Sequence, residues 1–244
     1  LLREAGVQIE AAAGHSLGEY AALAVAGVFD WEEGLRLVRV RGQAMSEAAE
    51  ARPGAMAAIL GLDDAQVDAA CHAAAHQTST GPHHPGVVTA ANFNGPGQVV
   101  ISGEAKAVEA AIEECKKRGA KRALPLPVHG AFHSPLMASA VPKMEGALEM
   151  AELNDPTVRV VANVTGDFIT RVDDIRIALA AQIMSCVHWT GTMRTLLDAG
   201  IELFVEVGPG KVLSGILKRM NKEAVCLNCS TKDDIQKVLE AYNA

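Results

Sequence analysis

The sequence has few aromatic residues, few cysteines and no excess of basic residues, and it lacks a long apolar run. Aromatic residues make up 4% of the chain and the net charge at pH 7 is -7, which excludes an overall basic field for nucleic acid. The longest apolar stretch, residues 20–29, is about half of the ~20 residues that a membrane-spanning helix needs. Glu4 and Glu10 do not fit a signal peptide. We therefore expect a cytoplasmic protein whose partners include neither nucleic acid nor membrane.

Cysteine is too sparse for a disulfide framework. The five cysteines are an odd number, and Cys71, Cys115 and Cys186 lie far apart in a chain of 244 residues, which predicts buried thiols. Cys226 and Cys229 form a C-x-x-C without a second pair, which is a weak signal for a metal or redox site. Four histidines lie close together in the sequence: His72, His76, His83 and His84. Two fall on the polar face of a predicted helix and two in a Gly/Pro-rich loop, so a solvated surface is favoured over a metal cluster.

The remaining composition is that of a folded globular protein. Hydrophobic residues make up 49% and charged residues 21%, and the length allows roughly one to two domains. The pattern predicts a strand over residues 8–13 and helices over 17–27 and 31–50, the last ended by Pro53-Gly54. After residue 126 helices alternate with strands at 158–164, 203–207 and 224–228.

Residues 54–125 have a different pattern from the segments on either side. Strands are predicted over 55–60, 87–92, 99–102 and 121–126, with helices over 63–75 and 105–118. This β-α-β-β-α-β order is typical of a ferredoxin-like unit. We therefore predict an α/β fold in which residues 1–53 and 126–244 form the large domain and residues 54–125 an inserted ferredoxin-like subdomain.

Gly14-His15-Ser16-Leu17-Gly18 is a G-x-S-x-G between a predicted strand and a predicted helix. This context is typical of a nucleophile elbow and makes the large domain α/β-hydrolase-like. Glycine at both outer positions lets the backbone turn tightly while the Ser16 hydroxyl projects outward. The backbone N–H of Leu17, at the start of the helix, can bind an oxyanion. A glycine-rich turn with a capping serine is the alternative interpretation.

A serine hydroxyl needs a base to act as a nucleophile. His129 and His133 both lie in the loop where the chain returns from the inserted unit to the large domain. The residues alone do not separate these two, and a structural role is the alternative for each. We expect one of them to lie beside Ser16.

Five segments of the chain resemble the malonyl-CoA:acyl carrier protein transacylases and the related acyltransferase domains of fatty acid and polyketide synthases. In chain order they are GHSLGEY at residues 14–20, RGQAM at 41–45, NFNGPGQ at 92–98, AFHS at 131–134 and EVGPGKVL at 206–213. Their order and spacing cover almost the whole chain, which makes the resemblance specific.

The resemblance implies roles for individual residues. Ser16 becomes the acyl-accepting nucleophile, and His133, rather than His129, becomes its general base. The family orients this histidine through a backbone carbonyl, and the matching position is Gln182. A carbonyl selects the tautomer by accepting the Nδ1 proton. The expected site thus contains Ser16, His133, the Gln182 carbonyl and the Leu17 N–H.

Arg41 takes the place of the arginine that holds the malonyl carboxylate in this family. A planar guanidinium suits bidentate binding of a carboxylate. An exposed helix arginine, like Arg36 and Arg39 beside it, is the interpretation that composition alone favours. Leu17 and the Phe132-His133-Ser134 sequence resemble malonyl-selecting members, so malonyl is the expected acyl group.

The resemblance also implies a segment that this sequence does not contain. The family begins with a first strand and a Gly-Gln-Gly-type loop whose glutamine helps to form the oxyanion hole. This sequence starts directly before the nucleophile strand. We therefore expect about a quarter of the catalytic domain to be missing here, and the Leu17 N–H to be the remaining oxyanion donor.

The implied reaction is a two-step transfer through a malonyl-serine ester, from malonyl-CoA to the phosphopantetheine thiol of acyl carrier protein, without a metal or redox cofactor. Acyl carrier proteins are acidic, so a basic patch is expected to receive them. Lys116-Lys117-Arg118 with Lys121-Arg122 is the densest candidate, with an ordinary solvated helix end as the alternative.

Three other functions remain open at this point. A serine hydrolase such as a thioesterase shares the elbow, but usually places an acidic residue between the serine and a late histidine. A polyketide-type acyltransferase domain would use the same residues. A non-catalytic acyl-binding module is the third alternative.

Overall fold

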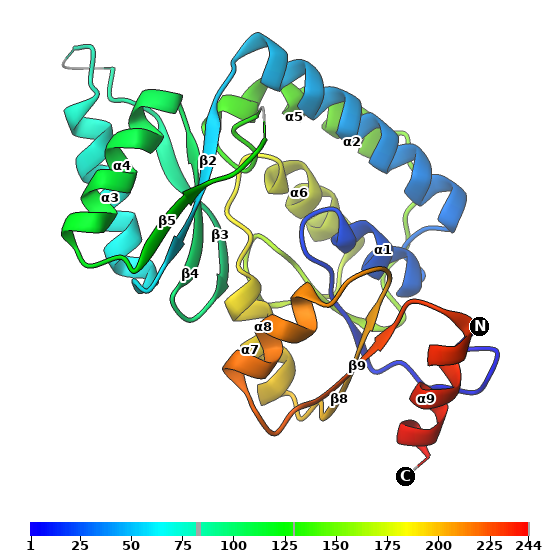
Figure 1. Ribbon diagram of the computed structural model, residues 1–244. Coiled ribbons are helices and arrows are strands. Elements are labelled where there is room, and N and C mark those ends of the chain that lie inside the picture. The colour runs from blue at the N-terminus through cyan, green and yellow to red at the C-terminus, as the bar shows by residue number, and fades with distance from the viewer. Residues whose placement is uncertain (82–83, 129, 244) are drawn as a thin grey trace.

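The computed structural model describes residues 1–81, 84–128 and 130–243. His83 of the histidine group and His129, the rival to His133 as a base, therefore lie outside the described residues. Figure 1 shows the chain in two lobes, with one antiparallel sheet and its two helices on one side and the remaining helices and small sheets on the other.

The first lobe contains the six elements of the segment between residues 54 and 125. They are β2 (Ala55–Leu60), α3 (Asp64–Gln77), β3 (Val88–Gly95), β4 (Gln98–Gly103), α4 (Ala105–Lys117) and β5 (Arg122–Pro125). All neighbouring strands are antiparallel, in the order β3-β4-β2-β5. Helices α3 and α4 cover one face of this sheet (Figure 1), and the apolar side chains between them form a core of their own. The mixed α/β character predicted from the sequence is confirmed.

Local capping explains where the helices of this lobe begin and end. The Asp63 side chain accepts a hydrogen bond from the backbone N–H of Gln66, and the Gln66 side chain accepts one from the backbone N–H of Asp63. These two bonds form a capping box at the start of α3. Gly119 follows α4 with a φ of +96°, the left-handed conformation that favours glycine after a helix end. Pro96-Gly97 turns β3 into β4, with Gly97 at a φ of +71°.

The second lobe has short strands and longer helices. Strand β1 (Ala11–Ala12) pairs in parallel with β6 (Arg159–Val161), and β7 (Phe168–Ile169) pairs antiparallel with β6. The strands predicted over 8–13 and 158–164 are therefore shorter than expected. Alanine has a weak preference for strands, and β1 must leave the sheet directly into the turn that carries Ser16. Strand β8 (Leu203–Val207) pairs in parallel with β9 (Val225–Cys229) in a separate sheet.

Helices α1 (Gly18–Val25), α2 (Trp31–Ala51), α5 (Val141–Glu149) and α6 (Val172–Gln182) surround the main core of this lobe. Asp30 caps α2 by accepting a hydrogen bond from the backbone of Glu33 at 2.8 Å. A short 3-10 helix (Pro135–Ala140) leads into α5 and packs on α2. The last helices are α7 (Trp189–Asp198), α8 (Val212–Met220) and α9 (Lys232–Tyr242).

The two lobes are joined by a hydrogen-bonded contact next to the loop that follows α6. The N–H of Phe93 in β3 donates to the carbonyl of Val187 at 2.9 Å, and the N–H of Val187 donates to the carbonyl of Ala91 at 2.8 Å. The segment between α6 and α7 thus forms a short parallel bridge with β3. This bridge ties the end of α6, where Gln182 lies, to the sheet of the other lobe.

None of the helices in the described residues is both long and apolar enough to cross a membrane. The cysteines are free, with Cys71, Cys115 and Cys229 buried and Cys186 and Cys226 half-buried. His72, His76 and His84 are exposed, as the sequence predicted. Within the described ranges no three His, Cys, Asp or Glu side chains lie close enough together to hold a metal ion.

Candidate active site

Ser16 lies in the sharp turn between β1 and α1, and its backbone is left-handed, with a φ of +50°. The turn is so tight that a Cβ on Gly14 would lie 1.9 Å from the carbonyl oxygen of Gly18. A side chain at Gly14 is therefore excluded, as the sequence predicted. For Gly18 the prediction is wrong in its reason, because a Cβ there would meet nothing within 4 Å. The turn is tight because the backbone carbonyl of Gly18 lies next to Gly14, where only a residue without a side chain fits.

His133 is the histidine that the structure places beside Ser16. Its Nε2 lies 2.8 Å from the Ser16 Oγ, and its Nδ1 lies 2.9 Å from the carbonyl oxygen of Gln182. Because a carbonyl can only accept, Nδ1 carries the proton and Nε2 is left to accept from the serine hydroxyl. The Gln182 carbonyl predicted from the resemblance is thus in contact with the histidine.

The loop that carries His133 is held by its own residues. His133 has a φ of +58° and is only 5% exposed. Next to it, the Ser134 hydroxyl donates to the carbonyl of Ala131 at 2.6 Å and accepts from the N–H of Leu136 at 3.3 Å, which caps the following 3-10 helix. This local capping explains why a left-handed histidine keeps a single orientation toward Ser16.

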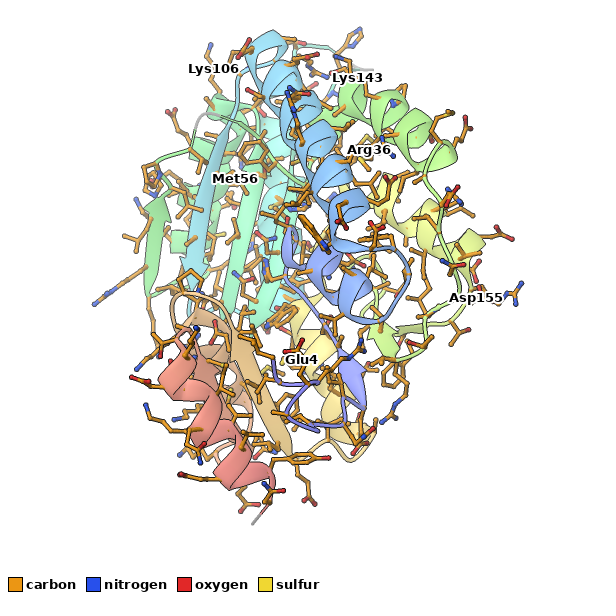
Figure 2. All side chains as sticks on the ribbon, turned by 90° about the vertical axis from the view of Figure 1, so that its right-hand side faces the viewer. Glu4, Arg36, Met56, Lys106, Lys143 and Asp155 are labelled. Atoms are coloured by element: carbon orange, nitrogen blue, oxygen red, sulfur yellow. The ribbon has the colours of Figure 1, made fainter. Side chains whose placement is uncertain are left out.

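Arg41 differs from the other arginines of α2 in its burial. Arg36 and Arg39 are exposed on α2, where Figure 2 labels Arg36. Arg36 donates to the carbonyl of Ala147 in α5 at 3.0 Å, whereas Arg41 is 6% exposed. The Nη2 of Arg41 donates to the Ser16 Oγ at 2.8 Å, and its guanidinium lies 5.8 Å from the centre of the Tyr20 ring. The interpretation of Arg41 as a solvated arginine is therefore wrong, because its place on the helix faces the nucleophile.

The guanidinium of Arg41 has unused hydrogen-bonding capacity. Its Nε is buried and has no partner among the described residues. Burial lowers the pKa of Arg41, but a guanidinium keeps its proton in proteins. A buried cation with a free donor beside a nucleophile can accept an anionic substrate group.

Burial also sets the protonation state of His133. Desolvation lowers the pKa of its imidazole from 6.5 to about 4, although the Gln182 carbonyl raises it, and the positive charge of Arg41 lowers it further. The imidazole is therefore neutral at pH 7. A neutral imidazole with an unprotonated Nε2 can take the proton of Ser16.

The Leu17 N–H is at the position that the sequence predicted for an oxyanion donor. Leu17 precedes the first residue of α1, and no acceptor for its N–H is found within the described residues. N–H groups in the first turn of a helix have no intrahelical partner. This donor is available to a negative oxygen that develops at the carbon attacked by Ser16.

Two buried residues next to Ser16 were missed by the sequence reasoning. Asn163 follows β6 and is fully buried, and its Oδ1 accepts from the Ser16 N–H at 2.7 Å while its Nδ2 donates to the Gly14 carbonyl at 2.8 Å. Glu19, in the first turn of α1, is 3% exposed. The only available signals were a polar side chain after the apolar run at 160–162 and an acidic residue at the end of GHSLGE.

The predicted basic patch lies away from this site, on α4 and β5. Its helix cations are paired with carboxylates of the same helix, Lys116 with Glu113 at 2.8 Å and Lys117 with Glu114 at 2.8 Å. Arg118 also pairs with Glu114, at 2.5 Å. These ion pairs reduce the positive field of the helix part of the patch.

Comparison with known proteins gives the same family as the site. Residues 1–238 match the family model of the acyl transferase domain. The malonyl CoA-acyl carrier protein transacylase of Bacillus subtilis (strain 168) is 41% identical over 238 residues, which cover 98% of this chain and 73% of that protein. The protein of the same name from Escherichia coli O157:H7 is 49% identical over 208 residues, which cover 85% of this chain and 65% of that protein.

A solved structure is similar over nearly the whole chain. It is described as a type II polyketide synthase acyl-carrier protein in complex with its malonyl-transacylase. The match has a TM-score of 0.90 and 40% sequence identity, and it covers 98% of this chain and 75% of that one. The chain belongs to the acyl transferase family, among the malonyl-CoA:acyl carrier protein transacylases.

Proposed function

We propose that the chain transfers a malonyl group from malonyl-CoA to the phosphopantetheine thiol of acyl carrier protein, as in fatty acid biosynthesis, through a malonyl ester on Ser16. The observation that carries this proposal is the buried Arg41 guanidinium 2.8 Å from the same Ser16 oxygen that lies 2.8 Å from His133. A nucleophile, a base and a cation for a carboxylate thus meet at one atom.

In the first half-reaction, the Nε2 of His133 takes the proton of the Ser16 hydroxyl as Oγ attacks the thioester carbon. The carbonyl oxygen becomes negative and is stabilised by the Leu17 N–H. The thioester bond then breaks, and the CoA thiolate leaves with the proton from His133. The product of this step is a malonyl ester on Ser16 and free CoA.

The second half-reaction runs the same steps in reverse. The phosphopantetheine thiol of acyl carrier protein gives its proton to His133 and attacks the ester carbon. The bond to the Ser16 Oγ breaks, the proton returns to Ser16, and the malonyl thioester of the carrier protein leaves. Every proton is carried by His133, so the reaction consumes no other reactant.

Arg41 provides the selectivity for a dicarboxylic acyl group. A malonyl group has a free carboxylate, and burying it without a cation would cost roughly 3–5 kcal/mol. This corresponds to about 10²- to 10³-fold in rate or affinity. Acyl groups without a carboxylate have no anionic group for the guanidinium to bind.

A hydrolase is less well supported by the geometry. The Nδ1 of His133 faces the carbonyl of Gln182 and not a carboxylate, and a carbonyl stabilises an imidazolium less. Ester hydrolysis also does not require a buried arginine bound to the nucleophile, as Arg41 is here. A polyketide-type acyltransferase would use the same residues, and it differs in its carrier protein.

The strand arrangement supports the two-domain division proposed from the sequence. Residues 54–125 contain β2-α3-β3-β4-α4-β5, with strand order β3-β4-β2-β5, as expected for an inserted ferredoxin-like subdomain. Residues 1–53 and 126–244 form the α/β-hydrolase-like domain, in which the elbow lies between a parallel strand and a helix. The cytoplasmic location and the docking patch around Lys117 and Arg122 stay predictions.

Intact-mass spectrometry after mixing with malonyl-CoA tests the proposed function. We expect one malonyl adduct on the wild-type chain, located on Ser16 by peptide mapping, and no adduct on Ser16→Ala. Addition of acyl carrier protein with its phosphopantetheine arm should remove the adduct and produce malonyl-carrier protein. Release of CoA without an adduct would favour a hydrolase, and neither CoA release nor an adduct would favour a binding module.

A further inference from the structure

Glu19 has a buried carboxylate in the first turn of α1, three positions after Ser16. The reaction described above does not use it. Its Oε1 accepts from the backbone N–H of Asn163 at 3.1 Å, and its Oε2 accepts from the side-chain Nε2 of Gln182. No lysine or arginine among the described residues forms an ion pair with it within 4 Å. A carboxylate buried in this way is held by its two N–H donors.

Gln182 connects Glu19 to the backbone of Ser16 and to the side chain of His133. Its Nε2 donates to the Ser16 carbonyl at 3.0 Å as well as to Glu19, and its own backbone carbonyl accepts from His133. Its Oε1 is buried and has no partner in the described part of the chain. The Glu19 carboxylate is therefore the group that keeps the amide nitrogen, and not the amide oxygen, facing Ser16.

Asn163 connects Glu19 to the other side of the elbow. Its backbone N–H binds Glu19, while its side chain binds the Ser16 N–H and the Gly14 carbonyl. The nucleophile turn is thus held from two directions, by Asn163 at its N–H and by Gln182 at its carbonyl. Glu19 is the acceptor common to both.

We propose that Glu19 is a positioning residue of the transfer reaction, which acts through Gln182 and Asn163 to hold the Ser16 hydroxyl in line with His133. The inference rests on the proposed function. It requires both carboxylate oxygens to accept hydrogen bonds, so Glu19 works only when it is ionised.

An amide in place of the Glu19 carboxylate would remove one hydrogen bond of this network, the one from Gln182 to the Ser16 carbonyl. In Glu19→Gln the new NH₂ group faces a donor, either the backbone N–H of Asn163 or the NH₂ of Gln182. The backbone cannot turn, so the Gln182 amide rotates and presents its free Oε1. The hydrogen bond from Gln182 to the Ser16 carbonyl is then lost, although the variant has nearly the same shape.

Burial supports a functional titration of Glu19. Desolvation raises its pKa to about 7, against the hydrogen bonds from Asn163 and Gln182 and the positive charge of Arg41, which lower it. The other titratable groups around it are Tyr20 on the same helix, with a pKa raised by burial, and His133, which is neutral above about pH 4. Between pH 6 and 8, Glu19 is the group of this set whose charge changes.

The test is the rate of malonyl loading from malonyl-CoA, followed by rapid mixing and intact-mass detection between pH 5.5 and 8.5. For Glu19→Gln we expect a rate at pH 8 that is lower by about 10- to 100-fold, because small misplacements of reacting groups have effects of this size. The KM for malonyl-CoA should change by less than about threefold. The wild-type rate should rise with pH around 7, and the Glu19→Gln rate should lack this rise.

The matched control is Glu114→Gln on α4. Glu114 is also buried and also accepts from a glutamine side chain, the Nε2 of Gln77 at 2.9 Å, but it lies outside the site. The Glu114→Gln variant should have a rate of malonyl loading within about twofold of wild type and the same pH profile. Loading involves no carrier protein, so the ion pairs of Glu114 with the basic patch do not affect this comparison.

Gln182→Leu provides a second test if Glu19→Gln does not fold. It keeps the backbone carbonyl for His133 and removes the side-chain amide, so loading should slow by a similar factor. The double variant should be no slower than the slower single variant, since both changes break one linkage. Additive losses, or a Glu19→Gln variant with wild-type rate and pH profile, would overturn the inference. A wild-type chain that does not load malonyl would overturn the proposed function instead.

Discussion

Ser16 and His133 share a left-handed backbone, with φ values of +50° and +58°, and they are the non-glycine residues of the described chain with positive φ. Their side chains meet at 2.8 Å across 117 positions of sequence. Each such conformation costs of order 1–3 kcal/mol and persists only where its surroundings enforce it. Here Asn163 enforces the first and the capped loop at Ser134 the second.

The strain at Ser16 predicts an order of stability between two inactive variants. Ser16→Gly and Ser16→Ala both remove the hydroxyl, but only glycine adopts a positive φ without steric cost. We expect the glycine variant to have a free energy of unfolding about 1 kcal/mol above that of the alanine variant, measured by urea denaturation. Equal stabilities would mean that the turn is not strained.

Arg41 should discriminate between acyl groups. Arg41→Ala is expected to lower kcat/KM for malonyl-CoA by about 10²- to 10³-fold more than for acetyl-CoA, because only malonyl loses a partner for its carboxylate. Arg39 is an exposed arginine of the same helix, so Arg39→Ala is the control and should leave kcat/KM unchanged for both substrates. Equal losses with both substrates would show that Arg41 does not bind the carboxylate.

His133 should make stability depend on pH. Its pKa is lowered from 6.5 to about 4, so between these pH values the unfolded chain binds a proton that the folded chain does not. Stability from this group is therefore complete above about pH 6.5 and is lost as the pH falls toward 4, by about 3 kcal/mol in total. The raised pKa of Glu19 acts in the opposite direction.

The measurement is therefore a difference between two proteins. Urea denaturation is carried out on wild type and on His133→Asn at several pH values. The free energy of unfolding of wild type minus that of His133→Asn should decrease as the pH falls from 6.5 to 4. A difference that is independent of pH would show that the imidazole is not buried in its neutral form.

Asn163 should contribute to both stability and rate. Asn163→Ala leaves the Ser16 N–H and the Gly14 carbonyl without partners, which costs about 2–4 kcal/mol for two buried groups. Loading of malonyl should slow as well, since the elbow loses its anchor. Asn221→Ala, which removes a cap at an exposed turn, is the control and should cost no more than about 1 kcal/mol. Similar costs at both positions would contradict the role of Asn163.

The basic patch makes a prediction about the second half-reaction only. Lys117→Glu with Arg122→Glu should raise the KM for acyl carrier protein by about 10-fold at low salt and leave loading from malonyl-CoA unchanged. Lys222→Glu with Lys232→Glu, at two exposed lysines outside α4 and β5, provides a control with the same change in net charge. Unchanged carrier-protein kinetics in the double variant would place docking elsewhere.

Much of the local structure could be predicted because its causes are local in the sequence. The capping box at Asp63, the glycine after α4 and the strand from Ala55 to Leu60 lie where the pattern indicated. The short β1 was harder to predict, because its length depends on its pairing with β6, in which Ala11 lies opposite Arg159, 148 positions later in the sequence (159 - 11). The order of the elements could be predicted from the sequence, but the lengths of β1 and β6 could not.

The sequence by itself determined the elbow, since the missing side chain at Gly14 and the strand-to-helix order are enough to present Ser16. It also determined the family, through motifs that cover the chain. Only the tertiary structure decided that Arg41 is buried while Arg39 is exposed, and that Glu19 is held by Asn163 and Gln182. The burial of Arg41 depends on its contact with Ser16, 25 positions earlier, and the position of Glu19 depends on hydrogen bonds to residues 144 and 163 positions away. No local pattern encodes these contacts.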